Sequence, residues 1–372
     1  MTRHRTAPLL AVLREPGLMA RLSLTQWDLL VRQARTAGLL GRLHALALGA
    51  GVAAQLPAAP AAHLAAAHRM AAAQADEARR EVALVWQALH GLAVPVVLLK
   101  GAAYLMTGLP PADGRSFTDI DILVPKTALV EAESALLFHG WLTTHHDAYD
   151  QRYYREWMHE LPPMLHRQRG TVLDLHHGIL PETARLRPSA EKLIAAARPL
   201  ASEPLLQVLA PADMVLHSMV HLLHNEEMGR GLRDLSDLDL LLRHFAGTPG
   251  FWDQLVARAA ELGLERVLYY GLNEGQALLH TPVPPGTLQA IALHAPPPPL
   301  RRLMHELWQH ALGPQHASAT DAFTPLALGA VVLRAHWLRM PAGLLFRHML
   351  VKGWRRLTEK GQQSPEAAAP QV

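Results

Sequence analysis

Apolar positions in the first quarter of the chain recur every three or four residues, which predicts helices. The expected helices cover residues 8–14, 25–48 and 60–90. The last of these begins at Pro60, carries alanines throughout, and is ended by Gly91 and Pro95. We therefore expect an N-terminal helical region over residues 1–94.

From residue 95 to about residue 200 the pattern changes to short strands that alternate with helices. Residues 96–99 form an apolar run suited to a buried strand, and Gly101 follows at a turn that opens a helix. Residues 145–155 are polar and aromatic without a clear period, which favours a surface loop. The other expected elements are strands at 119–124, 141–144, 161–166 and 171–176 and a helix at 126–139. This alternation predicts an α/β core over residues 95–200.

Helical periodicity returns beyond about Pro188 and continues through most of the remaining chain. Helices are expected at 211–225 and 232–242. The pattern predicts a C-terminal helical domain over 201–357. The polar tail at 358–372, with its alanines and prolines, is expected to be disordered.

Composition narrows the possible functions only slightly. The chain has 372 residues, 50% of them hydrophobic, and a formal net charge of +3, which does not predict DNA binding. It has no cysteine, which excludes disulfides, thiolate zinc sites and cysteine nucleophiles. No run of about 20 apolar residues is free of charges, and Arg14, Glu15 and Pro16 interrupt the only apolar stretch near the beginning. We expect a cytoplasmic protein without a transmembrane span.

Candidate chemistry begins with Asp119 and Asp121, which lie two residues apart in an alternating segment. On a strand both carboxylates point to the same face. Like charges repel by about 4 kcal/mol at 4 Å in a medium of effective dielectric about 20, so such a pair needs a cation or a proton. A metal site is one interpretation, and an exposed edge strand made soluble by its acids is the other. Asp237 and Asp239 repeat the spacing in a helical segment, where they point in different directions.

Asp174 is a further candidate acid, on the second strand of the predicted hairpin, where it shares a face with Val172 and His176. It is alternatively a structural partner of Arg115 or of a buried histidine. Upstream, the backbone N–H groups at the start of the helix after Gly101 suit a phosphate.

These residues resemble a bacterial family of uncharacterised nucleotidyltransferases, within the superfamily of DNA polymerase β. The resemblance covers residues 95–177 and a helical region after Pro211. It departs from the wider superfamily in having Lys-Gly-Ala at the turn in place of Gly-Ser or Gly-Gly. The motifs that carry it are Leu99-Lys100-Gly101, Arg115, Asp119-Ile120-Asp121 and Asp174-Leu175-His176.

The resemblance implies an α+β fold with a small mixed-sheet, polymerase β-like core. It implies that Asp119, Asp121 and Asp174 hold Mg²⁺ or Mn²⁺ and catalyse transfer of NMP from a nucleoside triphosphate, such as ATP, to an acceptor hydroxyl. The acceptor is open between protein, RNA and a small molecule such as a sugar or an antibiotic. The residues expected to bind the nucleotide are Lys100, Gly101, Arg115, Ser116 and His176.

Other interpretations remain beside this one. The fold could serve as an inactive nucleotide-binding or assembly module. His217, His221 and His224 share one helix face, which suits either a histidine-based metallohydrolase or packing against the core. Residues 324–356 mix apolar and basic positions, which suits weak contact with an anionic membrane surface or core helices with a basic outer face.

Overall fold

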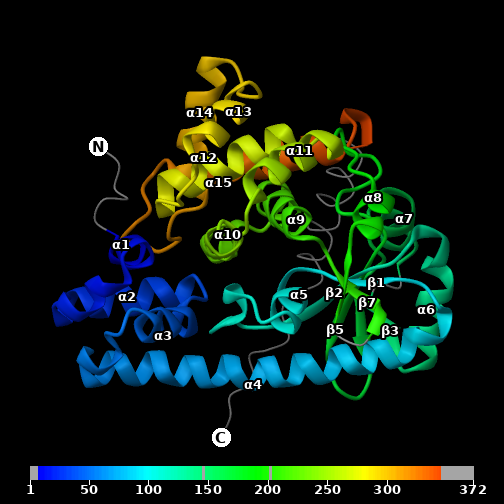
Figure 1. Ribbon diagram of the computed structural model, residues 1–372, viewed down its shortest axis with the longest axis horizontal. Helices are drawn as coiled ribbons and strands as arrows, with labels where there is room; N and C mark the ends of the chain where they lie inside the picture. Colours follow the sequence, from blue (N-terminus) through cyan, green and yellow to red (C-terminus); the bar gives the residue numbers. More distant parts are fainter. Residues whose placement is uncertain (1–6, 145–146, 201–202, 345–372) are drawn as a thin grey trace, which may run out of the picture.

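The computed structural model describes residues 7–144, 147–200 and 203–344 (Figure 1). The expected tail at 358–372 and residues 345–356 of the basic segment at 324–356 lie outside these residues. Within the described residues, seven strands form one mixed sheet, with helices before it, between its strands and after it. The fold is therefore α+β.

The N-terminal helices are separated by short turns. They are α1 (Pro8–Arg14), α2 (Leu24–Thr36), α3 (Leu40–Gly49) and α4 (Ala58–Leu89). The prediction of one helix over 25–48 is wrong, because α2 ends before Gly38, which has a φ of 68°. The Leu39 N–H then bonds to the Ala34 carbonyl at 2.8 Å, a left-handed helix ending that glycine adopts without strain.

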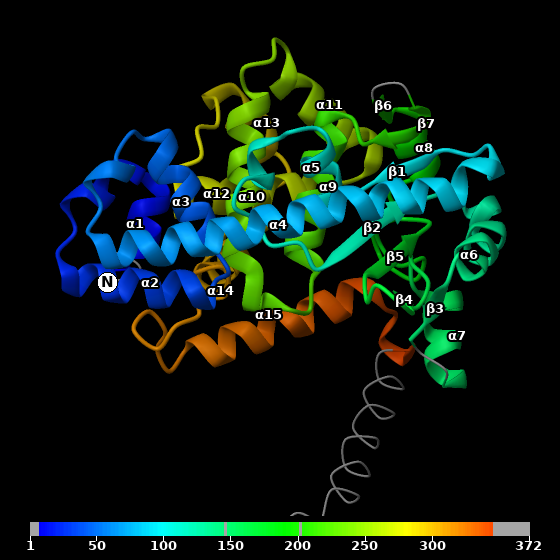
Figure 2. The ribbon, with the colours of Figure 1, turned by 90° about the horizontal axis from the view of Figure 1, so that it is seen from below.

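The long helix α4 has 32 residues and extends about 48 Å at 1.5 Å per residue. It runs from the N-terminal helices to the far side of the sheet (Figure 2). Its buried positions include Leu64, Val82, Val85 and Leu89, which pack into the same core as the sheet. The predicted helix at 60–90 is therefore confirmed.

The strands lie in the order β3-β4-β5-β2-β1-β7-β6. Their bounds are β1 (Val96–Leu98), β2 (Asp119–Leu123), β3 (Trp141–Thr143), β4 (Met164–His166), β5 (Val172–His176), β6 (Arg198–Leu200) and β7 (Glu203–Val208). Strand β2 is antiparallel to β1 and parallel to β5, and β7 is parallel to β1. The predicted hairpin is confirmed as β4 and β5, which pair antiparallel around the turn at Gly170.

Two predictions between residues 145 and 210 are wrong. Helix α7 (Ala148–Trp157) replaces the expected surface loop, because Tyr153 is buried against Met340 from the far end of the chain. Strands β6 and β7 replace part of the helical region expected beyond Pro188. Leu206 and Val208 alternate into the core, and β7 covers the edge of β1 that would otherwise be unpaired.

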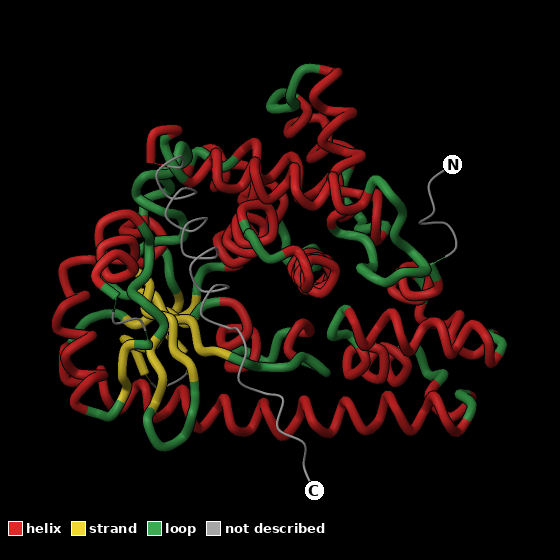
Figure 3. The backbone as a smooth tube through the Cα atoms, turned by 180° about the vertical axis from the view of Figure 1, so that it is seen from behind, coloured by secondary structure: helices red, strands yellow, loops and turns green. Residues whose placement is uncertain are grey.

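The remaining helices connect or cover the strands. They are α5 (Lys100–Met106), α6 (Leu129–Phe138), α8 (Ala190–Ala195), α9 (Pro211–His224), α10 (Gly231–Phe245), α11 (Phe251–Leu262), α12 (Glu265–Leu279), α13 (Pro285–Ala292), α14 (Pro298–Ala311) and α15 (Thr324–Arg339). The predicted helices at 211–225 and 232–242 are confirmed as α9 and α10. The strands gather at one end of the molecule, and the C-terminal helices pack above α4 in the same view (Figure 3). Among the described residues, no helix is both long and apolar enough to span a membrane.

Candidate functional site

The three predicted acids come together because β2 and β5 are parallel neighbours in register. Asp121 lies opposite Asp174, and Asp119 lies opposite Val172, two residues earlier on each strand. Side chains alternate along each strand, so Asp119, Asp121 and Asp174 occupy one face of the sheet. Ile120 and Ile122 occupy the opposite face and are buried in the core.

Asp121 is the buried member of this group, with 4% of its surface exposed. Its Oδ1 accepts hydrogen bonds from Lys100 Nζ at 2.9 Å and from His176 Nε2 at 3.1 Å. Burial alone would raise its pKa, but the charge of Lys100 and the hydrogen bond from His176 outweigh burial and hold the pKa well below its usual range. Asp121 is therefore a carboxylate whose orientation is fixed by two donors.

Asp174 has the opposite electrostatic environment. Its Oδ1 is buried and has no hydrogen-bond partner. Burial, together with the negative charges of Asp121 and Glu160, raises the pKa of Asp174 to about 7. An orphaned carboxylate oxygen among other acids is a group that a cation or a proton would satisfy.

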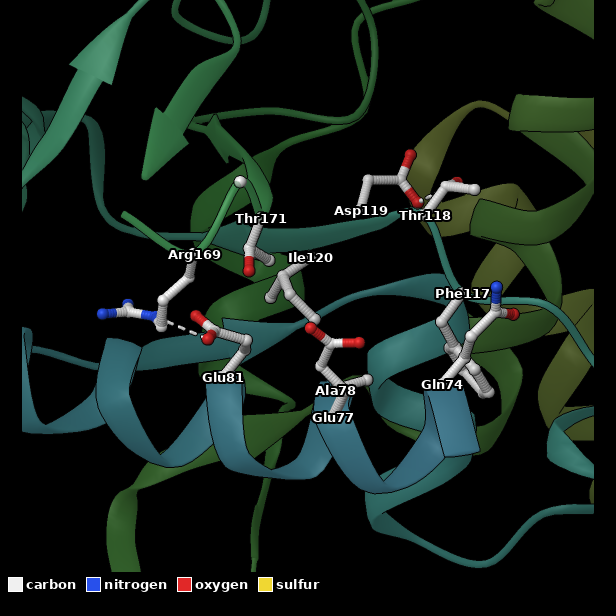
Figure 4. Close-up of a pocket in the computed structure, with 11 residues that line it drawn as sticks. Gln74, Glu77, Ala78, Glu81, Phe117, Thr118, Asp119, Ile120, Arg169 and Thr171 are labelled. Atoms are coloured by element: carbon white, nitrogen blue, oxygen red, sulfur yellow. Dashed lines mark hydrogen bonds and ion pairs between the residues drawn. The ribbon is translucent and has the colours of Figure 1, made fainter. Parts of the chain in front are cut away.

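Asp119 lies at the exposed start of β2 and borders two cavities. The smaller cavity, of ≈ 150 Å³, lies against α4, where Arg169 pairs with Glu81 at 2.5 Å. Its residues are drawn in Figure 4, in which the Asp119 carboxylate points away from Glu77 and Glu81. Thr118 Oγ1 donates to Asp119 Oδ1 at 3.2 Å. Asp119 is thus accessible to a ligand from the second cavity.

The second cavity is a cleft of ≈ 320 Å³ between the sheet and the helices that follow it. Its walls are rich in acids and histidines and include two permanent cations, Lys100 and Arg339. The residues that line it are Lys100, Asp119, His159, Glu160, Asp174, His176, Ile179, Leu180, His217, Val220, His221, His224, Asn225, Glu227 and Arg339. Of the three predicted acids, Asp119 and Asp174 therefore border a ligand-sized space, and Asp121 is not among its lining residues.

Helix α9 forms the wall opposite the acids with His217, His221 and His224. Burial is the largest cause that lowers the pKa of each, so these histidines are neutral near pH 7. From the sequence, the face of the helix that carries these histidines was expected either to bind metal or to pack against the core. In the structure this face lines the cleft. The described side chains whose potential ligand atoms lie within 4.8 Å of one another are a different group, His159, Glu160 and His176.

Lys100 and Gly101 are held differently from the expectation. Lys100 has a φ of 43°, which is strained for a residue with a side chain, and its ammonium pairs with Asp121. A Cβ on Gly101 would lie 3.1 Å from Arg115 Nε and 3.4 Å from the Phe117 ring. The absence of a side chain at Gly101 therefore makes room for the chain's own Arg115.

Arg115 does not face the cleft. It is 9% exposed, and its Nη1 donates to Asp237 Oδ2 at 2.7 Å. Arg115 is therefore paired with a carboxylate from α10, and its expected contact with phosphate stays a prediction. Ser116 is exposed and is not among the residues that line the cleft.

His159, Glu160 and Arg339 were missed as site residues. Arg339 comes from the end of α15 and bonds to Glu226 at 2.7 Å, a contact that no local pattern indicates. The pairing of the predicted hairpin could have indicated His159 and Glu160. Met164 pairs with Leu173 in the antiparallel hairpin. If this pairing is continued past the start of β4, the residues just before β4 lie opposite the end of β5, and Glu160 does form a β-bridge with His176 there.

No curated protein and no solved structure matches the chain. A family model described as an uncharacterised nucleotidyltransferase matches residues 23–280, which is more than half of the chain and includes Asp119, Asp121 and Asp174. The chain therefore belongs to this family of uncharacterised nucleotidyltransferases.

Proposed function

We propose that the protein transfers a nucleoside monophosphate from a nucleoside triphosphate to an acceptor hydroxyl, on a polymerase β-like core. The observation that carries this proposal is the parallel register of β2 and β5, which directs Asp119, Asp121 and Asp174 to one face beside a cleft. Membership of the nucleotidyltransferase family supports the general reaction.

The donor set fits Mg²⁺ or Mn²⁺, which prefer oxygen ligands. The orphaned Oδ1 of Asp174 and the crowding of acids around it fit a divalent cation at this place. Asp119, Asp121 and Asp174 would hold it. When bound, the metal neutralises charge on the triphosphate and lowers the pKa of the acceptor hydroxyl.

The chain's own groups then have separate tasks. Lys100 and His176 keep Asp121 ionised and oriented. Asp174 either holds the cation or, where it is free of the cation, accepts the proton of the acceptor hydroxyl, because a pKa of about 7 suits a general base near neutral pH. The acceptor oxygen forms a bond to the α-phosphorus, the bond from that phosphorus to the bridging oxygen breaks, and pyrophosphate leaves. Arg115 does not line the cleft, and the permanent cations that do are Lys100 and Arg339, so a triphosphate would compete with Asp121 and Glu226 for them.

The test is a screen of α-labelled nucleoside triphosphates with Mg²⁺ or Mn²⁺ and host extract as the source of acceptor. Wild type is compared with Asp119→Asn/Asp121→Asn and with Asp253→Asn, an exposed acid on α11, as the matched control. The double variant should lose label transfer by roughly 1,000-fold or more, and the control should keep it. Equal labelling by wild type and the double variant would overturn the proposal.

One observation favours a second candidate, a nucleotide-binding or assembly module without turnover. The Lys100 ammonium occupies the Asp121 oxygen at 2.9 Å, so part of the charge that would attract a metal is already neutralised. This candidate predicts that calorimetry detects nucleotide binding, with equal affinity in the presence of Mg²⁺ and of chelator, and that no label is transferred. Binding that requires Mg²⁺ would exclude it.

A further inference from the structure

Beside the aspartates, a second cluster of potential metal ligands lies on the same side of the cleft. Glu160 Oε2 is 3.3 Å from His176 Nδ1 and 3.9 Å from His159 Nε2. The potential ligand atoms of these three residues all lie within 4.8 Å of one another. A small shift of flexible side chains would bring them to the distances of about 2.0–2.2 Å at which nitrogen and oxygen bind a metal.

The backbone holds this cluster in place. The His159 carbonyl accepts hydrogen bonds from the N–H groups of His177 at 2.8 Å and Gly178 at 3.2 Å. On the other side of Glu160, the Leu161 N–H donates to the Leu175 carbonyl at 2.9 Å. Residues 159–161 are thus fixed against the end of β5, so the three side chains come from two rigidly joined segments.

His176 has one nitrogen in a hydrogen bond and one that faces a carboxylate without a hydrogen bond. Its Nε2 faces Asp121 Oδ1, and because a carboxylate only accepts hydrogen bonds, Nε2 carries a proton. Its Nδ1 is buried without a hydrogen-bond partner, in a residue that is 3% exposed. That nitrogen faces the Glu160 carboxylate, an arrangement that is repulsive unless a proton or a cation lies between them.

We propose that His159, Glu160 and His176 form a binding site for a zinc-class divalent cation, separate from the carboxylate site for Mg²⁺ or Mn²⁺. Two imidazole nitrogens and one carboxylate suit Zn²⁺ or a similar transition metal and do not suit Mg²⁺, which prefers oxygen ligands alone. All three residues line the cleft, so a fourth position would be open to water or to an anionic oxygen of a substrate.

Asp121 has a defined role in this site. A histidine that binds a metal through one nitrogen commonly donates from the other to a carboxylate, which fixes its tautomer and orientation. His176 and Asp121 are arranged in this way. A cation would also offset the charge that Glu160 and Asp121 direct at Asp174. The site goes beyond the proposed transfer reaction and does not require a nucleotide.

The experiment uses the full-length chain, stripped with a chelator, dialysed against Zn²⁺ or Co²⁺ and then measured by elemental analysis and by the visible spectrum of Co²⁺. Wild type should retain about one equivalent and show the intense visible bands of tetrahedral Co²⁺. His159→Ala, Glu160→Gln and His176→Gln should each weaken binding by roughly 100-fold, since even outer partners of a metal site are worth about 10–100-fold.

Controls separate this site from other histidines and from the transfer reaction. His305→Ala removes a similar histidine–carboxylate pair outside the cleft, with Glu274 at 3.1 Å, and His221→Ala removes a cleft histidine that is not in the cluster. Both should retain the metal, as should Asp119→Asn. Glu160→Gln is nearly isosteric, so its circular dichroism should match that of wild type.

A wild-type chain that retains no Zn²⁺ would overturn the proposal, and so would a Co²⁺ spectrum that is unchanged in Glu160→Gln. Metal retention is measured without nucleotide. A failure of nucleotidyl transfer therefore leaves this result untouched, and the two proposals fail independently.

Discussion

The chain contains two Asp-x-Asp pairs, one on strand β2 and one on helix α10, and their side chains lie in different environments. Asp119 and Asp121 share one face of the sheet. Asp237 instead accepts from Arg42 at 2.8 Å and from Arg115 at 2.7 Å. Asp239, two residues on, accepts from Thr281 at 2.7 Å and from Arg243 at 2.9 Å.

Secondary structure alone accounts for this difference. Alternate residues of a strand point to the same side, whereas residues i and i+2 of a helix are rotated by about 200° from each other. The same spacing therefore concentrates charge on β2 and separates it on α10. On β2 the excess charge is available to a ligand, while on α10 each carboxylate joins distant parts of the chain. In this chain, only the Asp-x-Asp pair on the strand directs both carboxylates to one face.

The largest effect on stability should come from Asp237→Asn. The substitution leaves Arg42, which is 2% exposed, and Arg115 without the negative charge between them. Breaking a buried ion pair from one side costs about 3–5 kcal/mol. Urea denaturation should show this loss in the free energy of unfolding. Asp119→Asn, on an exposed residue of the strand pair, should change it by less than about 0.5 kcal/mol, and equal losses would remove the contrast.

Lys100→Met should have the next largest effect, because it leaves Asp121 buried without its ammonium partner. A loss of about 3 kcal/mol is expected near pH 7. The folded pKa of Asp121 is depressed in wild type, so the stability it contributes is present above the unfolded pKa and is lost as pH falls through the folded pKa. Lys100→Met should lose this acid dependence, as seen in denaturation curves measured between pH 3 and 7.

Lys192→Met is the matched control for that substitution. Lys192 pairs with Glu261 at 3.4 Å with both side chains about half exposed, and such surface pairs contribute about 0–1 kcal/mol. If both lysine variants lost equal stability, the Lys100–Asp121 pair would have no special role.

The sequence was sufficient for the parts of the site that local period determines. The alternation around Asp119 and Asp121 predicted a strand, and the alternation around Asp174 predicted another. The long helix α4 and the histidine face of α9 followed from helical spacing for the same reason. Each of these features depends on contacts within a few residues.

Features that depend on distant partners could not be predicted in this way. Arg115 is paired with an aspartate 122 residues away, so its orientation is decided by how α10 packs. Strand β7 is stabilised by pairing with β1, about one hundred residues earlier. Tertiary contact overrides weak local preference in both cases.

The contribution of Asp174, the third acid beside the strand pair, to the free energy of unfolding should depend on pH. Its pKa is about 7 in the folded protein, above the unfolded value, so the folded state retains a proton that the unfolded state has lost. Stability should therefore fall as pH rises from about 4 to about 7. In chelator, Asp174→Asn should stabilise the protein by roughly 2 kcal/mol at pH 8 and by much less at pH 4, a figure reduced because the side chain is partly solvated.

The quantity to compare between pH 4 and pH 8 is the difference in free energy of unfolding between Asp174→Asn and wild type, because the cleft histidines titrate in both proteins. A difference that is the same at pH 4 and pH 8 would contradict the assigned environment of Asp174. Addition of Mg²⁺ at pH 8 should stabilise wild type and not the variant, because a bound cation relieves the same repulsion.

The smallest effect should come from Asp239→Asn, within the helix pair itself. An asparagine Oδ1 can still accept from Thr281, and Arg243, whose side chain is 39% exposed, can turn to water. The expected loss is about 1 kcal/mol, against several for Asp237→Asn. Two neighbouring aspartates on one helix would then differ in proportion to the burial of their arginine partners, whereas two on a strand act on a common site. Equal losses of stability from Asp237→Asn and Asp239→Asn would contradict the idea that burial of the arginine partner sets the contribution of each acid.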